Sequence, residues 1–278
     1  MTHALAQSHL AAAAGDTIFP CGPCEARTYG ICSYVGHADL ARLAALATIM
    51  DLSRGQTFIH EDLPAEHFWI LILGSAKLFK LLPDGRRQIV RFAHAGNFLG
   101  LSASDRYGFS AEAIEPIRVC RISQRRLQAA LSTFGAMEQR LFEVAVSELA
   151  QAHEQMLLLG RKTAIERVAS FLLFQTSCPQ PRRVRAPRIY LPMCRGDIAD
   201  YLGLTVETII RSLAKLEKLR IIVVPNVREI VVLDSCRLAA LAHGSFGSIL
   251  VGSDELGFAT SRHLGKQSAF SSDYERVS

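Results

Sequence analysis

The 278-residue sequence has no apolar run long enough to span a membrane, and no basic N-terminal segment followed by a cleavable apolar core. It also lacks a glycine-rich nucleotide fingerprint, which argues against an enzyme, including one that uses a metal cluster for radical or electron-transfer chemistry. Neither sign of charge dominates, because 31 Lys and Arg residues against 26 Asp and Glu residues give a formal net charge of +5. Such a charge permits a nucleic-acid partner without requiring one. We therefore expect a cytoplasmic protein, long enough for one large domain or two ordinary ones.

The cysteines are odd in number, seven, and with no secretory signal this favours a reducing compartment over a disulfide framework. Three of them, Cys21, Cys24 and Cys32, fall within one short segment that glycine and proline interrupt. We expect this segment to be a loop rather than a regular helix or strand. A loop of thiolates can wrap a soft metal centre, for which the distant Cys120 is our candidate fourth ligand.

Several kinds of site fit this cysteine pattern. Three clustered thiols and one distant thiol suit a four-iron cluster or a zinc site. Structural zinc usually shows two close C-x2-C pairs or a Cys and His set, whereas only Cys21 and Cys24 have that spacing here. The thiols could also be unliganded, and Cys120 could be a buried thiol that packs as a small hydrophobic side chain. The cysteines alone leave these alternatives open.

The region after the cysteine loop has the pattern of short strands. Residues 1–36 are expected to form an N-terminal arm and the cysteine loop, and 37–135 a sensory domain. Within that domain, the β-rich runs 67–73 and 76–82 are separated by a Gly-Ser pair, and a Pro-Asp-Gly turn follows the second run. Several short strands at hairpin spacing predict a small antiparallel β-roll or barrel.

A long helix is predicted over residues 136–163, because no proline or glycine interrupts it before Gly160. Apolar residues recur along it at alternating steps of three and four, which is typical of a coiled-coil seam: Phe142, Ala145, Leu149, Ala152, Met156 and Leu159. The alternative is a helix that packs only on the core of its own chain. Its length and charged flanks favour a homodimer.

The last folded section, residues 164–242, is predicted to be a winged helix-turn-helix domain. Two helices separated by Gly203-Leu204-Thr205 form the helix-turn-helix, and Thr205 is the expected N-cap of the second helix. A small hairpin follows as the wing. Residues 243–278 are rich in glycine and serine, and we expect disorder there. The predicted fold class is α+β.

The second helix of this pair carries candidate base contacts. Glu207, Ile210 and Arg211 project from one face near its N-terminus, where such helices meet the major groove of double-stranded DNA. Arg211 can donate two hydrogen bonds to guanine, Glu207 can accept one from cytosine, and Ile210 can contact a thymine methyl. The alternative is a solvated helix in which Glu and Arg pair with each other. Flanking cations, Arg195 and Lys215 among them, favour DNA.

The order of these parts resembles the cAMP-receptor/FNR superfamily of bacterial transcription regulators, over about residues 20–240. The most specific resemblance is the run from Gly196 to Arg211, G-D-I-A-D-Y-L-G-L-T-V-E-T-I-I-R. The C-x2-C-x7-C spacing of Cys21, Cys24 and Cys32 is similar to that of FNR-branch members that sense oxygen through a [4Fe–4S] cluster. The resemblance implies that Cys120 is the fourth ligand.

The resemblance further implies a homodimer that reads a two-fold site like TTGAT-N4-ATCAA and acts with RNA polymerase. Two positions depart from the family pattern. Ile210 stands where serine is usual, so we expect an altered or relaxed preference at one base pair. Ala152 stands where many members carry an aspartate that opposes dimerisation, so we expect a dimer that persists longer after cluster loss.

The same resemblance bears on two other effectors, a cyclic nucleotide and haem. A cyclic nucleotide would need a glutamate after the loop glycine and an Arg-Ser pair for the phosphate. This chain has the loop Gly96–Gly100 and a phenylalanine before Ser110, so we expect no cyclic nucleotide. Haem is harder to exclude, because His60 and other histidines lie in the roll, although a lone histidine there is more often structural. The alternative function is a related regulator with structural zinc, or with a small-molecule or haem effector.

Cys194 occupies the expected N-cap of the first helix of the DNA-binding pair, where serine or threonine is usual. It could be a neutral replacement with a small cost in stability. It could also be a redox-active thiol, because helix N-termini and a neighbouring cation, here Arg195, promote thiol oxidation. An acidic oxidation product there would oppose DNA phosphates.

Overall fold

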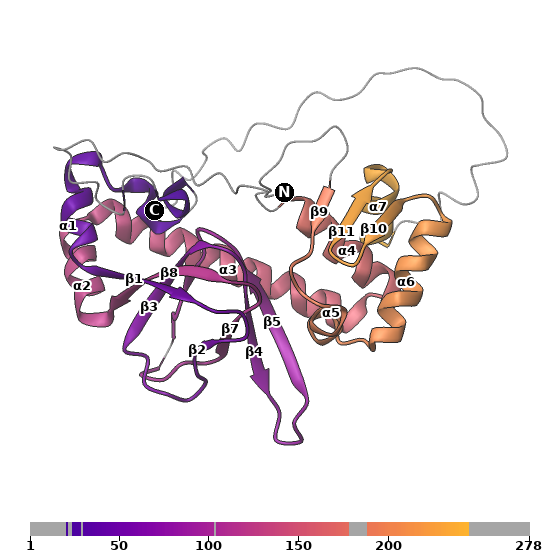
Figure 1. Cartoon of the computed structure of the whole chain (residues 1–278), viewed down its shortest axis with the longest axis horizontal. Helices are drawn as coiled ribbons and strands as arrows, with labels where there is room; N and C mark the ends of the chain where they lie inside the picture. The colour runs from indigo at the N-terminus through magenta and orange to yellow at the C-terminus, as the bar shows by residue number, and fades with distance from the viewer. Residues whose placement is uncertain (1–20, 22–23, 29, 103, 178–187, 245–278) are drawn as a thin grey trace, which may run out of the picture.

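The computed structural model describes residues 21, 24–28, 30–102, 104–177 and 188–244. The expected N-terminal arm before Cys21, the arginine-rich stretch 179–187 and the tail beyond Gly244 lie outside these residues. A β-roll lies at one end and a mixed helical domain at the other, and a long helix joins them (Figure 1). None of the described helices is long and apolar enough to cross a bilayer.

The cysteine segment contains short 3-10 turns, Glu25–Thr28 (η1), Ile31–Tyr34 (η2) and His37–Asp39 (η3), and is followed by the short helix Leu40–Ala44 (α1). Ile31 is fully buried and Val35 nearly so. These side chains pack on Ile70 and Phe98 of the roll and on Met137 of the long helix. The segment is therefore held between a sheet of the roll and the long helix.

The roll consists of eight short strands: Ala47–Leu52 (β1), Thr57–Ile59 (β2), His67–Leu73 (β3), Ala76–Leu81 (β4), Arg87–Ala93 (β5), Phe98–Leu99 (β6), Ser110–Ala113 (β7) and Ile117–Ser123 (β8). In the described chain they form two four-stranded antiparallel sheets, ordered β1-β8-β3-β6 and β2-β7-β4-β5. The predicted antiparallel roll is thus confirmed. The turn between β3 and β4 depends on Gly74, whose φ is +83° and where a Cβ would lie 2.7 Å from the Pro116 carbonyl oxygen.

Two helices follow the roll, Gln124–Thr133 (α2) and Gly135–Arg161 (α3). The second is the predicted long helix, and Gly160 lies within its last turn. Met137 and Leu158, near its two ends, are buried in the same chain, whereas much of its middle is exposed. This is the pattern of a helix anchored at both ends with a free central face.

The C-terminal domain begins with Ala164–Ser177 (α4) and continues with Arg188–Tyr190 (β9), Arg195–Leu202 (α5), Val206–Lys218 (α6), Ile222–Asn226 (β10), Glu229–Val232 (β11) and Ser235–Ala242 (α7). The predicted helix-turn-helix and wing are present as α5, α6 and the β10–β11 hairpin. Two elements were not predicted. β9 adds a third strand to the wing by pairing with β11, and α7 packs against α4.

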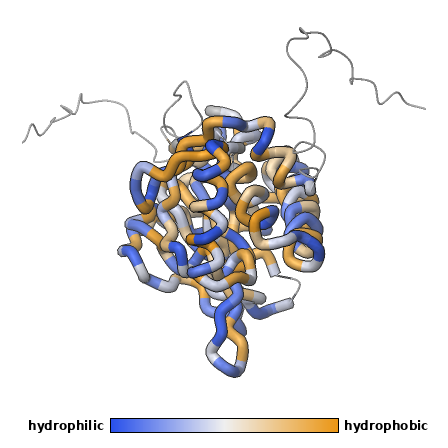
Figure 2. Tube along the Cα trace, turned by 90° about the vertical axis from the view of Figure 1, so that its right-hand side faces the viewer, coloured by the Kyte–Doolittle hydropathy of each residue, from blue (hydrophilic) through white to orange (hydrophobic). Residues whose placement is uncertain are grey.

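The C-terminal domain shares a hydrophobic core with one side of the roll. Phe79, Ile89 and Phe92 of β4 and β5 belong to the same buried cluster as Phe171 of α4 and the core of the helix-turn-helix. The ring of Phe92 lies 6.2 Å from that of Phe171 and 5.2 Å from that of Tyr201. The DNA-binding domain is thus docked on the β4–β5 hairpin, which projects from the body of the molecule (Figures 1 and 2).

Candidate metal centre and nucleic-acid interface

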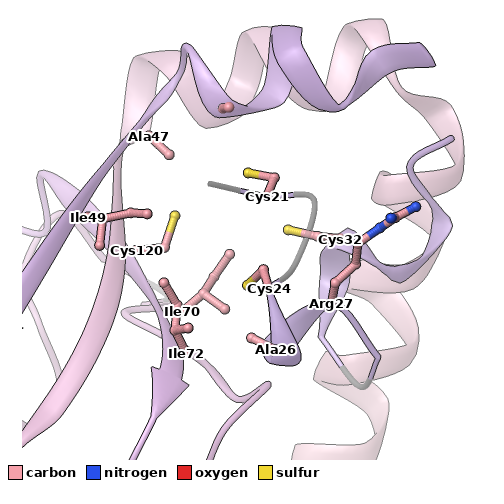
Figure 3. A pocket seen from close by; sticks show the side chains of 11 residues that line it. Cys21, Cys24, Ala26, Arg27, Cys32, Ala47, Ile49, Ile70, Ile72 and Cys120 are labelled. Atoms are coloured by element: carbon pink, nitrogen blue, oxygen red, sulfur yellow. The ribbon is translucent and has the colours of Figure 1, made fainter. Parts of the chain in front are cut away.

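The four candidate ligands come from two distant parts of the chain and line one pocket (Figure 3). Cys21 and Cys24 both precede η1, and Cys32 lies in η2. Cys120 lies in the middle of β8, where it pairs with Ile49 of β1 and Ile70 of β3. A central strand therefore fixes Cys120, and the folding of the cysteine segment onto the sheet brings the other three thiols to it.

The pocket is small and its walls are mainly apolar. Its volume is about 40 Å³, which exceeds the space that one water molecule needs. Besides the cysteines, it is lined by Ala26, Arg27, Ala44, Ala47, Ile49, Ile70 and Ile72. Such walls keep water away from a soft metal centre and lower the local dielectric constant.

Burial, together with smaller contributions from the nearby thiols Cys21 and Cys24, raises the pKa of Cys120 to about 12. The pKa of Cys32 is raised more strongly, first by burial and then by the charges that Cys120, Cys21 and Cys24 would carry. Burial and the neighbouring Cys24 also raise the pKa of Cys21. Thiolates in this pocket therefore need a cationic centre to compensate their charge.

Arg27 is the charged side chain in the pocket wall. Its Nη2 donates to the Val35 carbonyl oxygen at 2.9 Å, whereas its Nε is buried and has no hydrogen-bond partner among the described residues. Its positive charge lowers the pKa values of Cys21 and Cys32, against the larger effect of burial. An unused donor and a cation beside four thiols fit an anionic thiolate-bound centre. Among the described residues, no group of three or more Cys, His, Asp or Glu side chains is placed so that it could hold a metal ion.

The cysteine segment is linked directly to the start of α3. The guanidinium of Arg140, in the second turn of α3, stacks over the Tyr34 ring at 5.8 Å and pairs with Glu143 at 2.8 Å. Met137 is fully buried in the same cluster against which the cysteines pack. The sequence had not indicated Tyr34 or Arg140, because nothing in their spacing shows that the two segments meet.

The predicted seam of α3 is largely unpartnered in the single chain. Phe142 is 71% exposed, and Ala145, Leu149, Ala152 and Met156 are also exposed. Leu159 differs, because it is partly buried against the DNA-binding domain of its own chain. The exposed stripe also includes two large side chains that the predicted seam omitted, Val146 and Leu157. Their helical spacing from Phe142 and Leu149 would have revealed them.

The candidate base-reading side chains lie on the exposed face of α6. Ile209, Leu213 and Leu216 are buried against the domain, so the opposite face is free, with Glu207, Ile210, Arg211 and Lys215 on it. Ile210 is 54% exposed, which is unusual for an isoleucine. The side chain of Thr205 accepts from the Thr208 amide at 3.2 Å, which confirms the predicted N-cap. Arg211 donates to the Thr208 hydroxyl at 3.3 Å.

Cys194 and Arg195 stand at the start of α5. The Cys194 sulfur accepts from the Asp197 amide at 3.4 Å and lies 3.2 Å from Asp197 Oδ2, so that Cys194 is the N-cap in a capping box. Arg195 is only partly exposed, and desolvation lowers the pKa of its guanidinium. One of its nitrogens, Nη1, is buried without a hydrogen-bond partner in the described chain.

Comparison with known proteins is consistent with both halves of this architecture. Residues 49–134 match the family described as "Cyclic nucleotide-binding domain", and residues 166–241 match the "Crp-like helix-turn-helix domain". These matches and the fold are those of a transcription regulator with a β-roll and a helix-turn-helix. The chain belongs to the CRP/FNR family.

Several relatives cover most of the chain. The "Nitrogen fixation regulation protein FixK" of Bradyrhizobium diazoefficiens is 40% identical over 80% of this chain and 93% of its own length. The "Transcriptional activator protein FnrL" of Cereibacter sphaeroides is 31% identical over 78% of this chain and 90% of its own length. Among solved structures, FixK2 from Bradyrhizobium japonicum has a TM-score of 0.65 and 37% identity, covering 70% of this chain and 96% of that one.

Proposed function

We propose that this CRP/FNR-family regulator responds to oxygen or redox state through a [4Fe–4S] cluster held by Cys21, Cys24, Cys32 and Cys120. One observation carries this proposal: four thiols from two distant segments line one apolar pocket, with an unused cationic donor beside them. Cysteine thiolates are the ligands of such clusters. When bound, a cluster would supply sensitivity to oxygen.

The contacts around the pocket suggest how its state reaches α3. Cys32 and Tyr34 lie in the same short turn, and Tyr34 stacks on Arg140 of α3. A change in the position of the η2 turn would therefore act directly on the first turns of the helix that carries the exposed seam. This contact gives the pocket a route to dimerisation that does not pass through the sheets.

The homodimer is proposed to form through the exposed stripe of α3. An apolar stripe along a helix of 27 residues is costly to leave in water, and a second copy of the same helix would bury it. Two copies would present two α6 helices to the half-sites of a two-fold DNA site. A single helix-turn-helix seldom binds tightly enough to compete with genomic DNA, so dimerisation would control binding.

We further propose that the roll binds no cyclic nucleotide, although its fold is that of a cyclic-nucleotide-binding domain. The Ser110 hydroxyl accepts from the Glu61 amide at 3.0 Å, and the residue after the loop glycine Gly100 is Leu101. The nearby Arg91 is neutralised by Glu148 of α3 at 2.5 Å. We also propose RNA polymerase as a partner, by similarity to the family.

The direct test is metal analysis of protein purified without oxygen. The proposal predicts about four iron atoms and an equal amount of acid-labile sulfide per chain. Zinc without iron would support the alternative of a structural zinc site, and protein with neither metal would show that the thiols are unliganded. Each of these last two results would contradict the cluster.

A further inference from the structure

The helix α5 immediately precedes α6, the recognition helix that carries the candidate base contacts. Charged side chains of the roll hold α5 in place. Asp197 and Asp200 stand three residues apart on α5 and face the β4–β5 hairpin. The Asp197 side chain is only 7% exposed. Burial would raise the pKa of Asp197, but hydrogen bonds from Lys77 and Cys194 outweigh it and hold the pKa below the usual value. The Asp197 carboxylate is therefore charged and needs cationic partners.

Two cations from the hairpin provide those partners. Lys77 of β4 lies with its Nζ 3.0 Å from Asp197 Oδ1 and 3.0 Å from Glu112 Oε1 of β7. Arg87 of β5 joins both aspartates, with its Nη2 2.9 Å from Asp197 Oδ1 and its Nε 2.9 Å from Asp200 Oδ2. A guanidinium that bridges two carboxylates one helical turn apart fixes the direction of the helix as well as its distance.

The other end of α5 is fixed in a similar way by neutral side chains. The Gln88 amide of β5 donates to the Asp200 carbonyl oxygen at 2.7 Å, and Gln155 of α3 donates to the Tyr201 carbonyl oxygen at 2.9 Å. Both carbonyls belong to the last turn of α5, where donors from outside a helix commonly complete the hydrogen bonding. Immediately afterwards, Gly203 turns the chain into α6 with a φ of +61°. Roll and dimer helix together thus determine where α6 begins.

Adhesion between the domains does not require these charges. The shared aromatic and aliphatic core already joins the roll to the DNA-binding domain, and a buried ion pair contributes little net stability once its desolvation is counted. What the charges add is a single allowed orientation. In a dimer, that orientation sets the separation of the two α6 helices, which must match successive major grooves.

We propose that Lys77 and Arg87 are positioning residues that hold the recognition helix at the angle required for a two-fold DNA site. The proposal rests on DNA binding by the dimer and is independent of any metal in the cysteine pocket. It makes the β4–β5 hairpin the part of the roll through which a change in the sensory domain reaches α6.

The test compares the full-length parent with Lys77→Met and Arg87→Met, using protein concentrations at which all are dimeric. Lys80→Met is the matched control, because Lys80 is also on β4 and pairs with Glu61 inside the roll at 2.7 Å. Each protein is titrated with duplexes that differ only in the spacing between half-sites, and with random DNA. We expect each variant to bind the best-spaced duplex about tenfold more weakly, a typical coupling between sites, and to discriminate less between spacings. The control Lys80→Met should keep the parental affinity for the best-spaced duplex and the parental discrimination between spacings.

A double variant separates positioning from loss of charge. If Arg87 acts through Asp200, Arg87→Met combined with Asp200→Asn should weaken binding no more than the stronger single change. The proposal is overturned if the variants keep the parental affinity and spacing preference, or if they lose affinity equally for all duplexes, random DNA included. A parent that ignores half-site symmetry would instead contradict the proposed DNA site. Arg87 is the more exposed of the two cations, so Arg87→Met carries the test if Lys77→Met does not fold.

Discussion

Cys120 is the cysteine whose place in the structure is set most firmly, because it lies on a strand paired on both sides. We predict that Cys120→Ala prevents the protein from holding iron under anaerobic conditions, since three thiols of a loop would lack the ligand on the sheet. The same loss is expected for Ala at Cys21, Cys24 or Cys32. Iron and sulfide are measured after identical anaerobic purification.

Cys236→Ala is the control for these variants. Cys236 is exposed at the start of α7, in the DNA-binding domain, and takes no part in the cysteine pocket. The Cys236→Ala substitution should therefore leave the iron content of the protein unchanged. A full four-iron complement in Cys120→Ala would remove Cys120 from the ligand set.

Arg211 and Lys215 differ in what they can read. Arg211→Ala should cost about 1–3 kcal/mol and relax discrimination at one guanine, because a forked donor pairs with that base edge. Lys215→Ala should weaken all sequences alike and reduce the salt dependence of binding. Affinities for specific and random duplexes, each at several salt concentrations, distinguish the two. If Arg211→Ala loses equal affinity for both duplexes, Arg211 makes no base contact.

Oxidation of Cys194 would weaken DNA binding independently of the cysteine pocket. Its sulfur lies 3.2 Å from Asp197 Oδ2, so a sulfinate there would repel that carboxylate and remove the α5 cap. We predict that peroxide lowers the DNA affinity of the dimeric parent but not of Cys194→Ser, because serine caps well and is not oxidised. Equal losses in both proteins would show that the switch lies elsewhere.

At the scale of elements, the exposed face of α3 leads to a prediction about dimerisation. Ala152→Asp should weaken the dimer, because two carboxylates would face each other in a desolvated seam. It should also make DNA binding depend more strongly on the cysteine pocket. Ser147→Asp is the control, since Ser147 is exposed on α3 but is not part of the seam. An unchanged monomer–dimer equilibrium for Ala152→Asp in sedimentation would mean that the seam is assigned wrongly.

Elements with strong local signals could be predicted from the sequence, and elements defined by distant pairing could not. The strand β3 occupies the predicted residues 67–73, because Gly74 ends it with a positive φ. The strand β9 has only three residues, too few for an alternating pattern, and it exists through pairing with β11. The helix α7 did carry a signal that was overlooked, the N-cap Asp234, whose side chain accepts from the Arg237 amide.

In the candidate site too, residues with a local sequence signal could be predicted, and residues whose roles depend on distant contacts could not. The cysteine spacing indicated a ligand set, and the structure places those thiols around one pocket. Arg27 and Tyr34 were missed because their roles depend on which surfaces meet. The pair of Lys77 and Asp197 joins residues 120 positions apart, and no periodicity in either segment reveals it.

For the whole molecule, two contacts and one exposed surface would connect sensing to DNA binding. The cysteine segment touches α3 through Tyr34, α3 presents the dimer stripe, and the β4–β5 hairpin holds α5. The cysteine segment and the helix α6 thus lie towards opposite ends of the molecule (Figure 1). Such an arrangement would let one chemical event change both dimerisation and the orientation of α6.

The central claim is that the cysteine pocket holds an oxygen-sensitive cluster which controls binding to two-fold DNA. The most direct measurement follows one anaerobic sample during controlled addition of oxygen, recording iron content, oligomeric state and affinity for a two-fold duplex together. We expect about four iron atoms per chain at the start, and then a loss of iron accompanied by weaker DNA binding. DNA affinity that stays constant while the iron is lost, or a protein that binds the duplex equally well without ever containing iron, would contradict it.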